Sequence, residues 1–301
     1  MKLLYIVLLV VILLLGITAF LALRAVRNLA YNLVHPMRQA ATSTPADFGL
    51  ENWEDVRFAA SNLELAGWFI PPTPAADGAT LIFVHGWSGN RSALLAQAAM
   101  LNKRGYGAFL IDLRNSGESE GTMTTWGFSE VEDVQGAFAY LLTRPEVNSE
   151  RIGLVGYSTG GATVIRAAAR MPEVRVVVAE SSYTAFVDNL PTIVDLLGGR
   201  LPPSCASLVL WFSELETGVA MREIRPIDDL TQIAPRPIMF LHGAQDEVVD
   251  VSHSQRLFVA AAEPKALQVF PNAKHEDIFS VDPAEFEQQV GSFLDAHLRE
   301  P

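Results

Sequence analysis

Several residue patterns that common functions require are scarce or missing in this sequence. A single cysteine, Cys205, among 301 residues excludes an internal disulfide and any metal site built from several cysteines. The formal net charge of −12 makes binding to the phosphate backbone of nucleic acids unfavourable. No G-x-G-x-x-G segment follows an apolar strand, so no nicotinamide site is expected. We therefore expect no metal, no cofactor and no nucleic-acid partner.

What the chain does have is a long apolar N-terminus. Residues 3–23 contain no charged residue, and at ~1.5 Å per residue such a helix crosses a bilayer core of ~30 Å. A cleaved signal peptide is the competing interpretation, but its apolar region is usually about 7–15 residues long. We predict a single-pass membrane anchor over residues 1–27 that contacts the lipid bilayer through residues 3–23. More basic residues follow this run than precede it, which weakly places the rest of the chain on the cytoplasmic side: they are Arg24, Arg27 and Arg38.

After a juxtamembrane segment and linker at residues 28–54, apolar strands alternate with helical segments. Ala79 to Val84 is an almost continuous apolar run, which is typical of a central strand buried on both faces. Repeated alternation of this kind over residues 55–299 predicts an α/β domain with a mainly parallel sheet flanked by helices. Residues 183–234 interrupt the alternation with glycine and proline pairs and an apolar helical piece. We interpret them as a cap insertion over an active site, against the alternative of an ordinary packed helix pair.

A G-x-S-x-G motif, Gly156-Tyr157-Ser158-Thr159-Gly160, stands between an apolar strand and an alanine-rich helix. In a strand–turn–helix context this motif holds the serine in a strained turn, and glycine at its two ends avoids a clash of Cβ atoms. The serine hydroxyl then lies at the positive end of the helix. Because short motifs recur by chance, a plain glycine–serine turn is the alternative. The motif thus predicts a nucleophilic serine, provided that a base and an acid accompany it.

Further polar segments directly follow predicted strands, at the strand ends where open α/β sheets bind ligands. They are His85-Gly86-Trp87-Ser88-Gly89, the segment from Asp112 to Ser119, the segment from His242 to Val249, and the segment from Pro271 to Asp277. Together with the serine motif, these segments resemble those of the α/β-hydrolase superfamily, and the resemblance covers roughly residues 55–299. The N-terminal apolar run lies outside it.

The resemblance implies a role for particular residues. Ser158 corresponds to the nucleophile, Asp246 to the triad acid and His275 to the base, in the chain order that this fold uses. The backbone amides of Trp87 and Thr159 correspond to the oxyanion hole. His85 and Asp112 correspond to structural residues, and Lys274 replaces the glycine that usually precedes the histidine. Two nearby acids remain alternatives to the triad acid: Glu247 and Asp250.

These residues predict a membrane-anchored serine hydrolase that cleaves carboxylic ester or thioester bonds through an acyl-enzyme. The anchor and the apolar insertion favour a lipophilic small-molecule acyl substrate, as for an esterase or lipase. A serine peptidase resembling the prolyl-oligopeptidase group is one alternative. A non-catalytic, membrane-tethered binding protein on the same fold is another, although such a protein has no chemical need for a triad.

Overall fold

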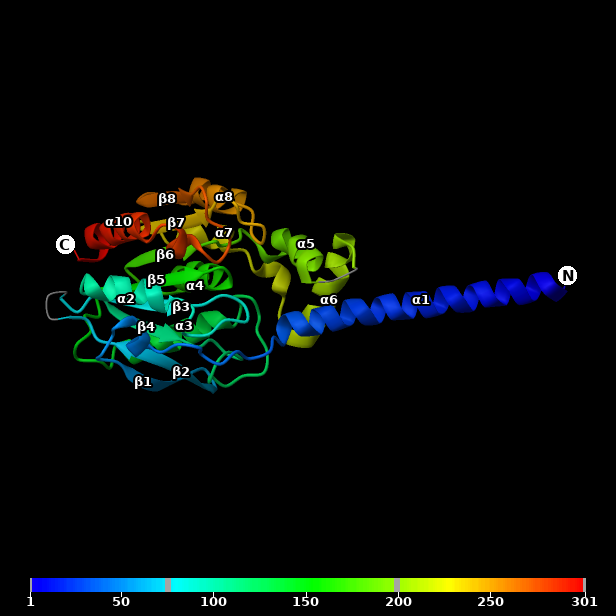
Figure 1. Cartoon of the computed structure of the whole chain (residues 1–301), viewed down its shortest axis with the longest axis horizontal. Coiled ribbons are helices and arrows are strands. Elements are labelled where there is room, and N and C mark those ends of the chain that lie inside the picture. Colours follow the sequence, from blue (N-terminus) through cyan, green and yellow to red (C-terminus); the bar gives the residue numbers. More distant parts are fainter. Residues whose placement is uncertain (1, 74–76, 198–200, 300–301) are drawn as a thin grey trace.

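The computed structural model describes residues 2–73, 77–197 and 201–299, and one eight-stranded sheet forms its centre (Figure 1). The strand order is β1-β2-β4-β3-β5-β6-β7-β8. The β1–β2 and β2–β4 pairs are antiparallel, and all later pairs are parallel. The predicted mainly parallel sheet is thus confirmed. The strands are β1 (Glu54–Ala60), β2 (Leu63–Ile70), β3 (Thr80–Val84), β4 (Gly107–Ile111), β5 (Ile152–Tyr157), β6 (Val176–Glu180), β7 (Ile238–Gly243) and β8 (Lys265–Phe270).

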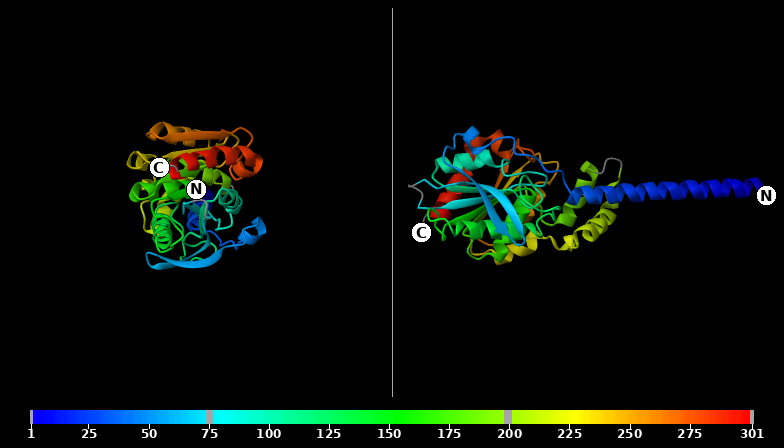
Figure 2. Two further views of the ribbon diagram at one scale, coloured as in Figure 1. Left: turned by 90° about the vertical axis from the view of Figure 1, so that its left-hand side faces the viewer. Right: turned by 90° about the horizontal axis from the view of Figure 1, so that it is seen from below.

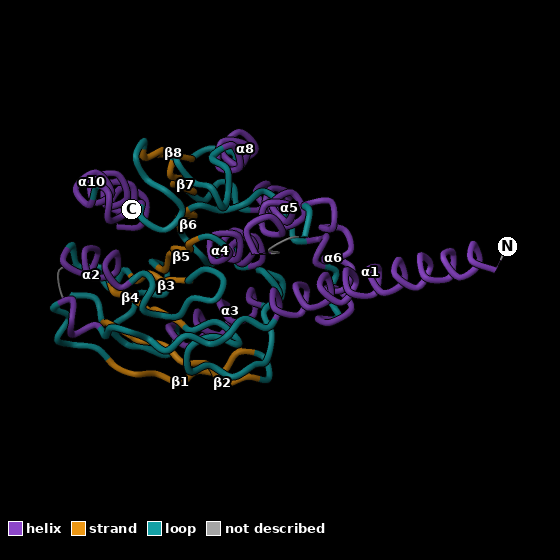
Figure 3. Tube along the Cα trace, turned by 45° about the vertical axis from the view of Figure 1, so that its right-hand side comes forward, coloured by secondary structure: helices purple, strands orange, loops and turns teal. Residues whose placement is uncertain are grey.

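Helices cover both faces of the sheet, so its central strands are apolar on both sides (Figure 3). All five residues of β3 are buried: Ile82 belongs to the core on one face, and Leu81 to the core on the other. The first core is covered by α3 (Glu130–Leu141), α4 (Thr159–Arg170) and α8 (Ser252–Ala260). The second is covered by α2 (Leu95–Lys103), α9 (Ile278–Val281), α10 (Pro283–Leu294) and the last turn η6 (Asp295–Arg299), with η1 (Pro45–Phe48) beside α2.

Between β6 and β7 the chain leaves the sheet and forms a group of helices. The described part of this insertion contains α5 (Phe186–Leu197), α6 (Ala206–Thr217) and α7 (Pro226–Asp229). The short turns η3 (Pro203–Cys205) and η4 (Met221–Glu223) precede α6 and α7, and η5 (Leu230–Gln232) follows α7. Residues 198–200 of the expected insertion lie outside the described residues. Helices α5 and α6 stand at one end of the sheet, beyond the carboxyl ends of the parallel strands (Figure 1).

The N-terminal apolar run forms one unbroken helix, α1 (Lys2–Val34), which projects from the domain along its long axis (Figure 2). Residues 2–25 are exposed, and this part is long and apolar enough to cross a membrane, a property that signal sequences share. The helix continues past residue 27, the expected end of the anchor. Its last turns pack one apolar stripe against the cap and the α/β domain: the buried residues are Val26, Leu29, Ala30, Leu33 and Val34.

Candidate active site

The turn from β5 into α4 holds Ser158 in a strained backbone conformation. Its φ of 56° lies in the left-handed region, and its ψ is −118°. A Cβ at Gly160 would lie 2.1 Å from the Val84 carbonyl oxygen, and one at Gly156 would lie 2.3 Å from the Gly160 carbonyl oxygen. Both glycines are therefore required by space, and the tight turn that they permit lifts the serine above the carboxyl ends of the strands.

A chain of hydrogen bonds joins the three residues that the resemblance singles out. Nε2 of His275 lies 2.9 Å from Oγ of Ser158, and Nδ1 of His275 lies 2.7 Å from Oδ2 of Asp246. Because a carboxylate can only accept, Nδ1 carries the hydrogen and Nε2 is left to accept the serine proton. Within the described residues, neither alternative acid, Glu247 nor Asp250, makes a hydrogen bond to His275.

The carboxylate of Asp246 is held in place on both of its oxygens. Oδ1 accepts the amide hydrogens of Val248 and Val249, both at 2.8 Å. Oδ2 lies 3.2 Å from Nε2 of His242, a second histidine that contacts the acid. Burial alone would raise the pKa of Asp246, but the hydrogen bonds from His242 and His275 outweigh it and hold that pKa below its usual range. The sequence did not indicate this contact of His242 with the acid.

The expected oxyanion loop passes directly beside the serine. A Cβ added to Gly86 would lie 3.2 Å from Cβ of Ser158, so the backbone of Trp87 enters the site. Within the described residues the Trp87 amide makes no hydrogen bond. Thr159 is the first residue of α4, so its amide belongs to the set that a helix leaves without an intrahelical partner. Trp87 and Thr159 both line the same cavity as Ser158.

Two other polar residues of the strand-end loops support the backbone. Nδ1 of His85 donates to the Gly86 carbonyl at 2.7 Å, and its Nε2 accepts the Leu113 amide at 3.1 Å. Burial lowers the pKa of His85, so the ring stays neutral and both nitrogens are occupied. Asp112 accepts the amide hydrogens of Arg91 and Glu118. The hydrogen-bond partners of both side chains are backbone groups, which fits the structural roles expected for His85 and Asp112.

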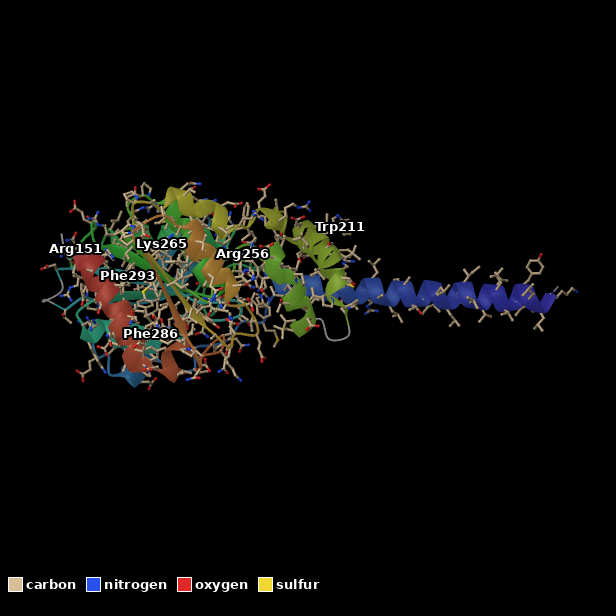
Figure 4. The ribbon with its side chains drawn as sticks, turned by 90° about the horizontal axis from the view of Figure 1, so that it is seen from above. Arg151, Trp211, Arg256, Lys265, Phe286 and Phe293 are labelled. Atoms are coloured by element: carbon tan, nitrogen blue, oxygen red, sulfur yellow. The ribbon has the colours of Figure 1, made fainter. Side chains whose placement is uncertain are left out.

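A cavity of about 220 Å³ lies over the serine hydroxyl, beneath α5 of the cap. Apolar and aromatic side chains make up most of its wall: Trp87, Trp126, Tyr157, Tyr183, Ile193, Leu196, Leu197, Val248 and Val249, with Ser158, Thr159, Asn189, His275 and Glu276. A larger hollow of about 710 Å³ is lined in part by Arg151, which lies at the opposite end of the molecule from the cap (Figure 4). It shares no lining residue with the cavity over Ser158. In the described part of the chain, no group of three or more metal-binding side chains occurs.

Trp126 is a residue of the site that sequence reasoning missed. Its φ of 58° is rare for a bulky side chain, and its ring stacks on that of Trp87 with the centroids 5.6 Å apart. Its carbonyl accepts the Tyr183 hydroxyl at 2.6 Å, and its indole Nε1 donates to the Leu33 carbonyl at 3.0 Å. The only signal in the sequence is an aromatic residue before Gly127 in a polar loop. Trp126 thus joins the cavity wall to the end of α1.

The fold and the site together define the class of this protein. An α/β sheet that presents a strained serine, an aspartate and a histidine from the loops after β5, β7 and β8 is the arrangement of a serine hydrolase of the α/β-hydrolase fold. The chain belongs to the prolyl oligopeptidase family, which matches residues 92–300. The resemblance to α/β-hydrolases stated from the sequence is therefore confirmed.

The chain is also similar to curated relatives and to solved structures of the same fold. The chain is 31% identical over 241 residues to the uncharacterized protein YfhR of Escherichia coli, covering 77% of this chain and 78% of YfhR. The structure is similar to that of the Pyrococcus furiosus esterase Pf2001, with a TM-score of 0.72 and 27% identity over 87% of this chain and 99% of the esterase. The Pyrococcus horikoshii acylaminoacyl peptidase shares the fold at 17% identity and a TM-score of 0.67, over 83% of this chain and 43% of the peptidase.

Proposed function

We propose that this protein hydrolyses carboxylic esters or thioesters through an acyl-enzyme on Ser158. The serine Oγ attacks the carbonyl carbon while its proton passes to Nε2 of His275. Asp246 accepts the hydrogen bond from Nδ1 and stabilises the imidazolium that forms. The amides of Trp87 and Thr159 donate to the negatively charged oxygen of the tetrahedral intermediate; the loss of one such donor typically lowers the rate about 10²- to 10³-fold.

Collapse of the intermediate breaks the bond to the leaving group. The departing alcohol or thiol takes the proton from His275, and the acyl group stays on Ser158. Water then attacks the acyl-enzyme as His275 removes its proton, and a second tetrahedral intermediate releases the carboxylic acid and the free serine. The observation that carries this proposal is the hydrogen-bonded chain from Ser158 to His275 to Asp246 on the wall of an apolar cavity.

The cavity favours an ester over a peptide as the substrate. Its wall is largely apolar, and its volume of about 220 Å³ is below the ~300–1,000 Å³ of common ligand pockets, which suits a short apolar acyl group. The similarity to the Pf2001 esterase supports the same choice. A peptidase is the second candidate, because the chain belongs to the prolyl oligopeptidase family. Acyl transfer to water from an amide uses the same residues, so the two candidates differ in the leaving group and its binding.

We further propose that α1 is a retained anchor and that the catalytic domain faces the cytoplasm. The exposed residues 2–25 supply the length and apolarity of a span, and basic residues follow it. Extraction of membranes at high pH should leave the protein in the pellet with an intact N-terminus. Protease added to sealed spheroplasts should leave the domain uncut. Release of a shortened protein in soluble form would instead identify a signal sequence.

The substrate class is tested with the full chain in detergent or lipid nanodiscs. We expect hydrolysis of short-chain p-nitrophenyl esters and acyl thioesters, and little cleavage of proline-containing peptides. Ser158→Ala should abolish ester hydrolysis, whereas the matched control Ser149→Ala, at the distant hollow, should not affect it. Faster cleavage of the peptides than of any ester would establish the peptidase. Full ester hydrolysis by the Ser158→Ala variant would refute the proposed nucleophile.

A further inference from the structure

The end of α1 is built into the wall of the active-site cavity. The carbonyl oxygen of Leu33 accepts the indole hydrogens of both cavity tryptophans, Trp87 at 2.9 Å and Trp126 at 3.0 Å. The next carbonyl, of Val34, accepts the Thr124 amide at 2.7 Å. Carbonyls at the end of a helix have no intrahelical partner, so these bonds satisfy groups that the helix leaves open. These bonds therefore hold the end of α1 in a defined orientation relative to the cavity wall.

A second set of contacts joins α1 to the cap. His35, which follows α1 directly, lies with Nδ1 2.6 Å from the Thr122 carbonyl and Nε2 3.1 Å from the Glu216 carboxylate of α6. Helix α6 itself packs along the last turns of α1, and Val209 of α6 is fully buried in the same apolar core as Val26 of α1. Because α1 is unbroken from Lys2 to Val34, it has no hinge on which the domain could swing away.

The geometry of one continuous helix sets the distance between the cap and a membrane. A span over residues 3–23 covers ~31 Å at ~1.5 Å per residue, which matches the apolar thickness of a bilayer. Arg24 then stands at the boundary, and Val26, the first residue of α1 that the domain buries, follows only ~3 Å further along the helix axis. The cap therefore begins at the level of the lipid headgroups.

The cap presents an apolar stripe on this side of the molecule. Leu208, Trp211 and Leu215 of α6 follow one another at helical spacing, and 47%, 50% and 62% of their surfaces are exposed. Figure 4 shows Trp211 at the end of the domain from which α1 projects. Leu196 and Leu197, at the end of α5, are about half exposed and also line the active-site cavity. Exposed apolar side chains thus occur both on the outside of the cap and at the cavity wall.

Glu216 of α6 contacts His35, so Leu215 lies at the end of the stripe away from the span and Leu208 at the end near it. We propose that this nearer end, at Leu208 and Trp211, rests in the headgroup and acyl boundary of the leaflet that α1 enters, and that the cavity receives its ester from the bilayer. Tryptophan and leucine on one face of a helix are the residues that such an interface favours, with the tryptophan at headgroup depth. The substrate class is accordingly a membrane-borne ester or thioester whose short acyl group enters the cavity past Leu196 and Leu197. This inference rests on the proposed function for its chemistry and on insertion of α1 for its geometry.

The position of the stripe is tested without any catalysis. The full chain in phospholipid nanodiscs, with Cys205→Ser as background, carries a spin label at Leu208→Cys or at the control Val259→Cys, an exposed site on α8. A third label at Leu14→Cys marks the span. We expect oxygen to relax the labels at Leu208 and Leu14 more than a water-soluble nickel chelate does, and the reverse at Val259. The proposal is overturned if the label at Leu208 behaves as the label at Val259 does, or if a second copy of the chain shields it from both reagents.

The delivery of substrate is tested by comparing two esters. Leu208→Glu combined with Trp211→Glu should lower hydrolysis of an ester dissolved in the bilayer at least about fivefold, because charge on the stripe opposes interfacial binding. Hydrolysis of a soluble short-chain ester should stay within about twofold, as expected for surface substitutions, and Val259→Glu should affect neither substrate. Equal loss on both esters, or no loss on either, contradicts delivery from the bilayer. If the unaltered protein hydrolysed neither ester, the proposed function would be refuted, whereas the position of the stripe measured by the spin labels would still hold.

Discussion

Glu180 carries a buried carboxyl group whose ionisation opposes folding. It ends β6 beside the nucleophile turn, 3% exposed, and its Oε2 accepts a hydrogen bond from Nε2 of Gln97 at 3.0 Å. Burial raises the pKa of Glu180 to about 7 from an ordinary value of 4.5, although the Gln97 hydrogen bond and the nearby His242 partly oppose this rise. In the folded protein the group therefore holds a proton that the unfolded chain has already lost.

The sign and size of the effect follow from proton linkage. Between pH 4.5 and about 7 the folded state binds the extra proton, so the free energy of unfolding falls as the pH rises through this window. The gap between the two pKa values corresponds to roughly 3 kcal/mol, at ~1.4 kcal/mol for each pH unit. The full cost is present above pH 7 and disappears below pH 4.5. Glu180→Gln removes the charge but keeps the shape, and should recover this free energy at high pH only.

Thermal unfolding of the full chain in nanodiscs, followed by tryptophan fluorescence, measures the difference. At pH 8, Glu180→Gln should raise Tm by roughly 6–12 °C over the unaltered protein, at ~2–4 °C per kcal/mol for a domain of this size. At pH 5 the two proteins should differ by less than about 3 °C. Glu150→Gln, at an exposed site, serves as the control and should leave Tm unchanged at both values. A Tm difference that is the same at pH 5 and pH 8, or no difference at pH 8, would refute the reasoning.

Three further substitutions have defined outcomes. Asp246→Asn should lower kcat about 10⁴-fold with little change in the circular dichroism spectrum, because the imidazole loses the partner that fixes its tautomer; activity near the unaltered level would exclude Asp246 as the acid. Gly160→Ala should destabilise the fold by about 3 kcal/mol or more, since the Cβ would lie 2.1 Å from the Val84 carbonyl, and a normal Tm would show that the turn can relax. Trp126→Phe removes the bond to Leu33 and should lower Tm by roughly 2–4 °C, which a melting curve checks directly.

The sequence was sufficient to predict the fold and the meeting of three distant residues. Ser158, Asp246 and His275 each follow an apolar strand, and the carboxyl ends of parallel strands meet at one edge of a sheet. The glycines at both ends of the serine motif were also predictable, because the turn leaves no room for a Cβ at either. Local periodicity thus predicted that these loops meet at one edge of the sheet, and the resemblance to α/β-hydrolases singled out the three residues within them.

Contacts between segments without a shared local pattern could not be predicted. The bond from Trp126 to the Leu33 carbonyl spans 93 residues, and the positive φ of Trp126 has no signature in a non-glycine residue. The contact of His242 with Asp246 depends on how the loop after β7 folds back. Likewise, the apolar face of α1 beyond residue 25 indicates burial but does not say which helix covers it. The structure assigns that role to α6 and the cavity wall.

The central claim is that Ser158 is a nucleophile activated by His275 within a working hydrolase. A fluorophosphonate probe reacts with such a serine and leaves a covalent adduct that peptide mass spectrometry locates. We predict one adduct, on Ser158, with labelling lost in both Ser158→Ala and His275→Ala variants that remain folded. Absence of labelling in the folded, unaltered protein would contradict the claim and favour a membrane-tethered binding protein on the same fold.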